Sequence, residues 1–129
     1  MATFNRIKGN FVETYAAAYL RRKGYRLLTR NYAYRGGELD IVAQDENDNA
    51  IVFVEVKSVW NNRQGNPASR VNYKKQQKIW QTACHFLYGH GGFEQKCRFD
   101  VLSVRTYQTP PTFTHIQNAF EGKQVIPQV

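Results

Sequence analysis

The sequence has no hydrophobic run long enough to cross a membrane. A transmembrane helix needs roughly 18 or more consecutive apolar residues, and no segment approaches that length. The first ten residues, MATFNRIKGN, lack the apolar core and the small-residue cleavage site of a signal peptide. We therefore expect a cytoplasmic protein that has no membrane partner.

Cysteine is also scarce, with only Cys84 and Cys97 present. In a cytoplasmic chain two such residues are most simply reduced and packed. The alternative is a zinc site that would add the neighbouring His85 and His90. Zinc sites typically show Cys or His pairs at spacings of about two to four residues, and this cluster has no such pairs. The spacing therefore favours packed thiols over a zinc site.

Acidic residues are few: the chain has 10 Asp and Glu against 18 Lys and Arg, a net charge of +8. Such an excess favours a polyanionic partner, because neutralised phosphates release condensed counterions. Charge alone does not separate nucleic acid from an acidic membrane surface. Each basic cluster, taken singly, is equally well explained as a solvated helix face.

Internal repeats, low-complexity stretches and linker-like segments are absent as well. The 8 Tyr, 8 Phe and 2 Trp, with 42% hydrophobic residues overall, exclude a disordered chain. A chain of 129 residues is long enough to bury a core without disulfides or metals. The sequence thus predicts a single domain over residues 1–129.

Hydrophobic periodicity and turn residues divide the chain into seven elements. The helices are expected at about 4–23 and 69–88, and the strands at about 25–32, 38–44, 50–59, 96–106 and 113–119. The third strand is apolar almost throughout, which is typical of a central strand covered on both faces. The order α-β-β-β-α-β-β predicts an α/β protein with a mixed central sheet flanked by helices.

The first helix carries two candidate faces. One bears Ile7, Phe11, Tyr15 and Ala18 at helical spacing and is predicted to be its apolar face. The other combines Glu13 with small residues, which suggests close packing and an acid that does not point simply into water. Its remaining members are Ala16, Ala17 and Leu20.

Charged residues interrupt strands that otherwise look buried. Glu55 and Lys57 lie two residues apart in the most apolar segment, so both side chains leave the same face of the strand. Glu38 and Asp40 share a face of the preceding strand in the same way. Burying a charge without a partner is costly, so these residues need an explanation. A structural ion pair between Glu55 and Lys57 is one explanation.

Asp40, on the preceding strand, favours a second explanation for the charges within these apolar strands. Two acids on neighbouring strands beside a lysine make an oxygen-rich pocket next to a positive charge. Hard cations such as Mg²⁺ bind carboxylate oxygens and keep several waters. The combination of Asp40, Glu55 and Lys57 therefore suits metal-assisted attack of water on a phosphodiester.

These segments resemble a known nuclease motif. Residues 37–43, GELDIVA, followed by residues 52–57, VFVEVK, resemble the PD-(D/E)xK motif. More narrowly, about residues 9–120 resemble the small bacterial YraN family, whose implied fold is restriction-endonuclease-like and closest in size to archaeal Holliday-junction resolvases. Other residues that carry the resemblance are Glu13, Arg30-Asn31, Gly65, Pro67, Lys75, Arg98-Phe99-Asp100-Val101 and Asn118-Ala119-Phe120.

The resemblance implies a DNA endonuclease that uses Mg²⁺ or Mn²⁺, acting on branched or junction DNA, and a homodimer would suit a two-fold symmetric junction. It implies that Asp40 and Glu55 hold the metal with the backbone carbonyl of Val56. Lys57 would position the attacking water and stabilise the developing phosphate charge, and Glu13 would be an accessory catalytic acid. The residues expected to contact nucleic acid are Lys75, Lys78 and Arg63.

The sequence departs from the family pattern at three positions. Val59 stands where a basic residue is common, and Arg63 is the nearest substitute. Leu39 replaces the proline that names the motif, and Glu38 is an extra acid beside Asp40. Farther along, Asp100 is either a structural acid at the edge of the core or a metal ligand, and we favour the structural role. Two other functions stay open: a nucleic-acid-binding module that has lost turnover, and a scaffold in which the charges only stabilise the sheet.

Overall fold

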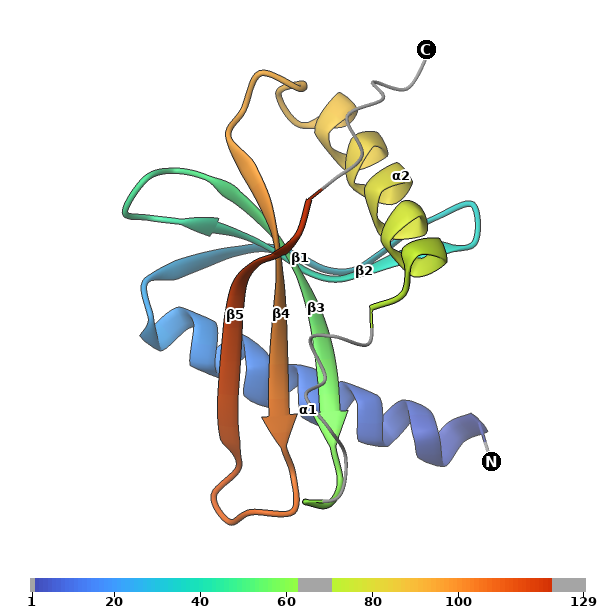
Figure 1. Ribbon diagram of the computed structural model, residues 1–129, viewed down its shortest axis with the longest axis vertical. Helices are drawn as coiled ribbons and strands as arrows, with labels where there is room; N and C mark the ends of the chain where they lie inside the picture. The colour runs from blue at the N-terminus through green and yellow to red at the C-terminus, as the bar shows by residue number, and fades with distance from the viewer. Residues whose placement is uncertain (1, 63–70, 122–129) are drawn as a thin grey trace.

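A five-stranded mixed sheet carries one helix on each face (Figure 1). The computed structural model describes residues 2–62 and 71–121, with side chains from residue 11 onward. Its elements are α1 (Ala2–Arg22), β1 (Tyr25–Tyr34), β2 (Gly37–Asp45), β3 (Ile51–Val59), α2 (Tyr73–Gly89), β4 (Cys97–Arg105) and β5 (Thr112–Phe120). This order confirms the predicted sequence of helices and strands.

The strands lie in the sheet in the order of the chain, from β1 to β5. β3 and β4 are parallel and are connected through α2, whereas the other neighbouring pairs are antiparallel. A parallel pair needs such a crossover because the chain must return to the same end of the sheet. This mixed α/β arrangement fits the restriction-endonuclease-like fold. None of the helices in the described residues has the length and apolar character that crossing a bilayer requires.

β3 is buried on both faces over its first half, as its apolar sequence predicts. Val52 and Val54 pack in the layer between the sheet and α1. Ile51 and Phe53 pack in the layer between the sheet and α2. Because successive side chains of a strand alternate between its faces, this segment needs apolar residues at every position. The first charged residue of β3, Glu55, follows directly after it.

The predicted apolar face of α1 is wrong. Phe11 and Tyr15 are 62% and 36% exposed, and Ile7 lies outside the residues with described side chains. The small residues instead let the helix backbone approach the sheet closely, so the denser packing forms on their side. The buried side chains of this face are Val12, Ala16, Ala17 and Leu20.

α2 begins at Tyr73, and the predicted start at Ser69 falls outside the described residues. The Asn72 side chain accepts a hydrogen bond of 2.9 Å from the Lys75 backbone N–H and caps the helix. This cap fixes where the first turn of α2 begins. The turn presents Lys75 near the strand residues that the sequence marked as a candidate site.

Candidate active site

The candidate site lies at the strand fork, the point where β2 and β3 separate. Their pairing register includes Ile41 opposite Val54, and one further step would place Asp40 opposite Glu55. At that step the Val56 backbone N–H donates to Asp40 Oδ2 over 2.8 Å. The Asp40 side chain thus accepts a hydrogen bond that a backbone carbonyl would accept in a regular sheet. The Asp40 and Glu55 carboxyl groups are close enough to hydrogen-bond each other. The structure thus brings together the two acids that the motif named.

These two carboxyl groups share one proton at neutral pH. Burial, the hydrogen bond to Glu55 and the Glu55 charge together raise the pKa of Asp40 to about 9. Burial alone would raise the pKa of Glu55 too, but the hydrogen bond with Asp40 and the charge of Lys75 hold that pKa below its ordinary value. Two adjacent buried carboxylates cannot both ionise cheaply. A proton or a bound cation must therefore accompany the pair.

Lys75 supplies a direct counter-charge to this pair. Its Nζ lies 3.0 Å from Glu55 Oε2, and its side chain is 51% exposed whereas that of Glu55 is 6% exposed. Burial would lower the pKa of Lys75, but the Glu55 charge outweighs it and raises that pKa. The residue predicted to contact phosphate is therefore an ion-pair partner of a candidate metal-binding acid in this structure. The contact of Lys75 with phosphate stays a prediction.

Lys57 leaves the same side of β3 as Glu55, and it is half-buried. Its charge also helps to keep the pKa of Glu55 low, after the contributions of burial, Asp40 and Lys75. Lys57 lies opposite Ser103 in the parallel register between β3 and β4. The Lys57 ammonium group therefore lies within electrostatic reach of Glu55, and its catalytic role stays a prediction.

Glu13 joins the same group of charges from α1. Its side chain is 14% exposed, and its Oε1 lies 3.9 Å from Arg30 Nη2. Burial raises the pKa of Glu13, against the opposing charge of Arg30, and the charges of Glu38 and Glu55 add to the increase. Arg30 is a neighbour of the site that sequence reasoning did not assign a role. Its only signal was the Arg30-Asn31 pair in the family resemblance.

The other predicted contacts with nucleic acid lie on or near α2. Lys78 follows Lys75 by one helical turn and is exposed. Arg63 lies outside the described residues. Glu38 is exposed on β2, within electrostatic reach of Lys75. Basic side chains of α2 thus lead away from the carboxyl pair along one side of the helix.

The donor set suits a hard cation that keeps much of its water. In residues 11–62 and 71–121, no three Asp, Glu, His or Cys side chains are grouped so that they could hold one ion. Asp40 and Glu55 supply two carboxylates, and the backbone carbonyl of Val56 is the third predicted ligand. Mg²⁺ is typically held by one or two carboxylates and several waters, so the residues present fit Mg²⁺ or Mn²⁺.

Both cysteines are free thiols with unreactive surroundings. Burial raises the pKa of Cys84 to about 11 and also raises that of Cys97. A thiol with a raised pKa is a poor nucleophile and a poor metal ligand at neutral pH. Nearby, His85 and His90 stack on Tyr34 and Phe86. These contacts agree with the interpretation of Cys84 and Cys97 as packed thiols.

Asp100 is a fully buried structural acid, with 0% exposure. It receives hydrogen bonds from Arg98 Nε over 3.1 Å and from the Asn118 backbone N–H over 3.1 Å. His115 Nε2 lies 2.7 Å from its other oxygen. A carboxylate with this many partners is satisfied within the fold, which agrees with the expected structural role.

The fold and this group of charges define a class of small mixed-sheet α/β proteins with paired carboxylates at a strand fork. The family described as "Uncharacterised protein family UPF0102" matches residues 12–104. The chain belongs to this family, which is also called YraN. The similarity extends along nearly the whole chain in several bacterial relatives.

Three relatives illustrate that similarity. A UPF0102 protein of Geobacter metallireducens is 40% identical over 121 residues, which cover 94% of this chain and 98% of the relative. One from Clostridioides difficile is 40% identical over 116 residues, covering 90% and 98%. One from Anaeromyxobacter dehalogenans is 40% identical over 110 residues, covering 85% and 81%. These names place the chain in a family and assign it no activity.

Asp40→Asn is expected to stabilise the metal-free protein above neutral pH. The pKa of Asp40 is raised from 3.8 to about 9. Between these two pH values the folded protein retains a proton that the unfolded chain loses. The stability contributed by that proton is therefore lost as pH rises. The lowered pKa of Glu55 makes stability increase with pH, but only in the acid range below neutral pH. We expect the amide introduced at this position to donate to Glu55 permanently and to add about 2 kcal/mol near pH 9.

The measurement is urea unfolding in EDTA between pH 5 and pH 9. The difference between Asp40→Asn and wild type should grow with pH, whereas the exposed acid control Glu46→Gln should follow wild type throughout. A gap that shrinks with rising pH would contradict the shared proton.

Proposed function

We propose that this protein is a metal-dependent endonuclease that hydrolyses phosphodiester bonds of DNA. The observation that supports the proposal is the Asp40–Glu55 carboxyl pair at the strand fork, with Lys57 beside it. A divalent cation carries more positive charge than a proton, so it would displace the proton that this pair shares. The same residues are the ones that the PD-(D/E)xK resemblance names.

Asp40 and Glu55 would hold Mg²⁺ or Mn²⁺, with the Val56 carbonyl. The metal, when bound, polarises the phosphoryl oxygen and lowers the pKa of a bound water. Lys57 orients the attacking water and stabilises the charge that develops on the phosphate. Glu13 serves as an accessory acid whose raised pKa lets it hold a proton closer to neutral pH. Lys75 is half exposed, so its ammonium can turn from Glu55 to a phosphate oxygen.

DNA is the proposed partner, because the net charge of +8 favours a polyanion. Lys75, Lys78 and Arg63 would supply phosphate contacts. A branched or junction substrate is proposed from the resemblance to junction resolvases, and a homodimer would match the two-fold symmetry of a junction. We place this activity in the cytoplasm, where chromosomal DNA and reducing conditions are found together.

A nucleic-acid-binding module without turnover is the second candidate. One observation favours it: Lys75 and the shared proton already neutralise the carboxyl pair without a metal. In such a module the acids would stabilise the sheet and the basic residues would bind DNA. The two candidates differ in whether a divalent metal binds at the pair and supports cleavage.

The deciding experiment compares purified wild type with Asp40→Ala on four-way, flapped and linear duplex DNA. Each reaction contains Mg²⁺, Mn²⁺ or EDTA. We expect wild-type cleavage with either metal, none in EDTA, and none by Asp40→Ala, whose DNA binding persists. If wild type binds these DNAs equally with and without metal but cuts none of them, the binding module replaces the nuclease.

A further inference from the structure

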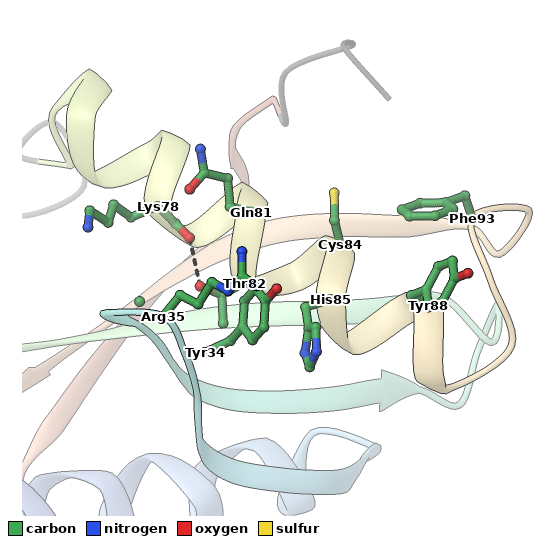
Figure 2. Close-up of a pocket in the computed structure, with 10 residues that line it drawn as sticks. Tyr34, Arg35, Lys78, Gln81, Thr82, Cys84, His85, Tyr88 and Phe93 are labelled. Atoms are coloured by element: carbon green, nitrogen blue, oxygen red, sulfur yellow. Dashed lines mark hydrogen bonds between the residues drawn. The ribbon is translucent and has the colours of Figure 1, made fainter. Parts of the chain in front are cut away.

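A cavity of about 520 Å³ lies between α2 and the turn that joins β1 to β2 (Figure 2), and neither Asp40 nor Glu55 lines it. Its walls are the turn between β1 and β2 and the middle and end of α2. This volume is within the range of small-molecule sites, about 300 to 1,000 Å³. The lining residues relevant here are Tyr34, Arg35, Lys78, His85, Tyr88 and Phe93.

One wall of the cavity is a fixed aromatic surface. The rings of Tyr34 and His85 stack with centroids 3.6 Å apart and an angle of 11° between their planes. Tyr32 Oη lies 2.6 Å from His85 Nδ1 and holds the imidazole in place. Tyr88, at the end of α2, is 64% exposed. The cavity therefore combines an ordered stack with an exposed aromatic ring, which suits a planar aromatic ligand.

The mouth of the cavity is cationic. The Arg35 guanidinium carbon lies 5.2 Å from the centroid of the Tyr34 ring, and Lys78 lies on the α2 side (Figure 2). The described residues that line the cavity include these two cations and no acid. Arg35 over the Tyr34 ring and Lys78 on α2 therefore place positive charge beside the aromatic side chains. This combination is complementary to a nucleotide, whose flat base is joined to a phosphate.

The hairpin turn is held rigidly against α2. A Cβ at Gly37 would overlap the Thr82 hydroxyl, and it would lie only 3.2 Å from the Lys78 backbone oxygen. The Thr82 hydroxyl itself donates to that oxygen over 2.8 Å. Only glycine permits so close an approach. The backbone of the turn is therefore set close to α2 by the fold itself.

We propose that this cavity binds an unpaired nucleotide, with its base against Tyr88 and the edge of the Tyr34–His85 stack and its phosphate at Arg35 and Lys78. The proposal rests on the proposed function, because it assigns the cavity to the same nucleic-acid strand. Ten residues of α2 separate Lys75 from His85, about 15 Å at 1.5 Å per residue. A single DNA strand can cross that distance within a few nucleotides. The preferred substrate is thus DNA with an unpaired base a few nucleotides from the scissile bond.

The test uses binding in EDTA, so that it does not depend on cleavage. The probes are a labelled duplex, a flapped duplex with 2-aminopurine at successive unpaired positions, and the matching single strand. Wild type is compared with Tyr88→Ala and Lys78→Gln, and the control is Tyr107→Ala, an exposed tyrosine between β4 and β5. Tyr88 is exposed, so its replacement should leave the fold intact, which circular dichroism checks.

We expect wild type to bind the flapped DNA more tightly than the duplex and to quench 2-aminopurine at one position a few nucleotides into the flap. Tyr88→Ala should lose this quenching and bind the flap at least about fivefold more weakly, with duplex affinity unchanged. Lys78→Gln should weaken flap binding and make its salt dependence shallower. Tyr107→Ala should behave as wild type.

Two outcomes separate this inference from the nuclease proposal. Tyr88-dependent binding of the unpaired base without cleavage in Mn²⁺ would support the cavity and overturn the nuclease. Metal-dependent cleavage, with Tyr88→Ala and Lys78→Gln binding flapped DNA as tightly as Tyr107→Ala does, would overturn the cavity assignment and leave the nuclease standing.

Discussion

Glu55→Ala is expected to abolish metal-dependent cleavage of DNA while leaving the fold intact. The variant removes one of the two carboxylates that would hold the metal, and it removes negative charge near the phosphate, so DNA affinity should stay equal or rise. Lys57→Ala should still bind metal yet lose about 100-fold or more in rate, because its role is at the attacking water and the developing charge. The two variants therefore separate metal binding from chemistry.

The measurement pairs calorimetric titration with Mn²⁺ and cleavage of four-way, flapped and duplex DNA. Glu94→Ala, which removes an exposed acid at the other end of the sheet, is the matched control and should retain both metal binding and activity. If wild type binds no divalent metal and cuts none of these DNAs, the nuclease proposal fails. A double replacement of Glu55 and its ion-pair partner Lys75 by methionine that is neutral or stabilising would then favour a purely structural ion pair.

Arg98→Met is expected to destabilise the protein by about 3 to 5 kcal/mol. Arg98 is 10% exposed and donates from Nε to Asp100 over 3.1 Å and from Nη1 to Asp45 over 3.2 Å. Its Nη2 also donates to Tyr25 Oη over 2.6 Å. Methionine retains much of the packing but leaves two buried carboxylates without their shared cation. The cost arises because a buried charge without a partner is far worse than a buried pair.

Urea unfolding at neutral pH measures this cost. Lys96→Ala is the matched control: it removes a cation just before β4 whose side chain is 70% exposed and paired with Asp48, so little or no change is expected. Adding Asp100→Asn to Arg98→Met should recover part of the loss, since one unpaired charge disappears. A loss for Arg98→Met as small as that of Lys96→Ala would show that the network does not depend on its arginine.

The order of elements and the candidate acids were predictable because both leave local signals in the chain. Apolar residues repeat with the period of a helix or a strand, and glycine and asparagine mark the turns between them. Asp40, Glu55 and Lys57 were conspicuous because each places a charge in a strand that is otherwise apolar. Strand adjacency then followed from the short turn between β2 and β3, which makes an antiparallel pair.

The buried face of α1 and the partners of the buried charges depended on how the helices dock. Ala16 and Ala17 are buried because small side chains let α1 lie close to the sheet, and the larger Phe11 remains outside. Local periodicity ranks faces by hydrophobicity and carries no information about the distance between helix and sheet. The predicted apolar face was therefore wrong although the helix itself was confirmed.

The sequence by itself determined which residues are anomalous, and the tertiary structure determined what they meet. Lys75 lies beside Glu55 because the Asn72 cap and the crossover from β3 set the first turn of α2 over the strand fork. The cavity exists because Gly37 lets the hairpin turn touch α2. Such contacts join residues that are distant along the chain, and their geometry depends on sheet twist and helix packing, which no local pattern encodes.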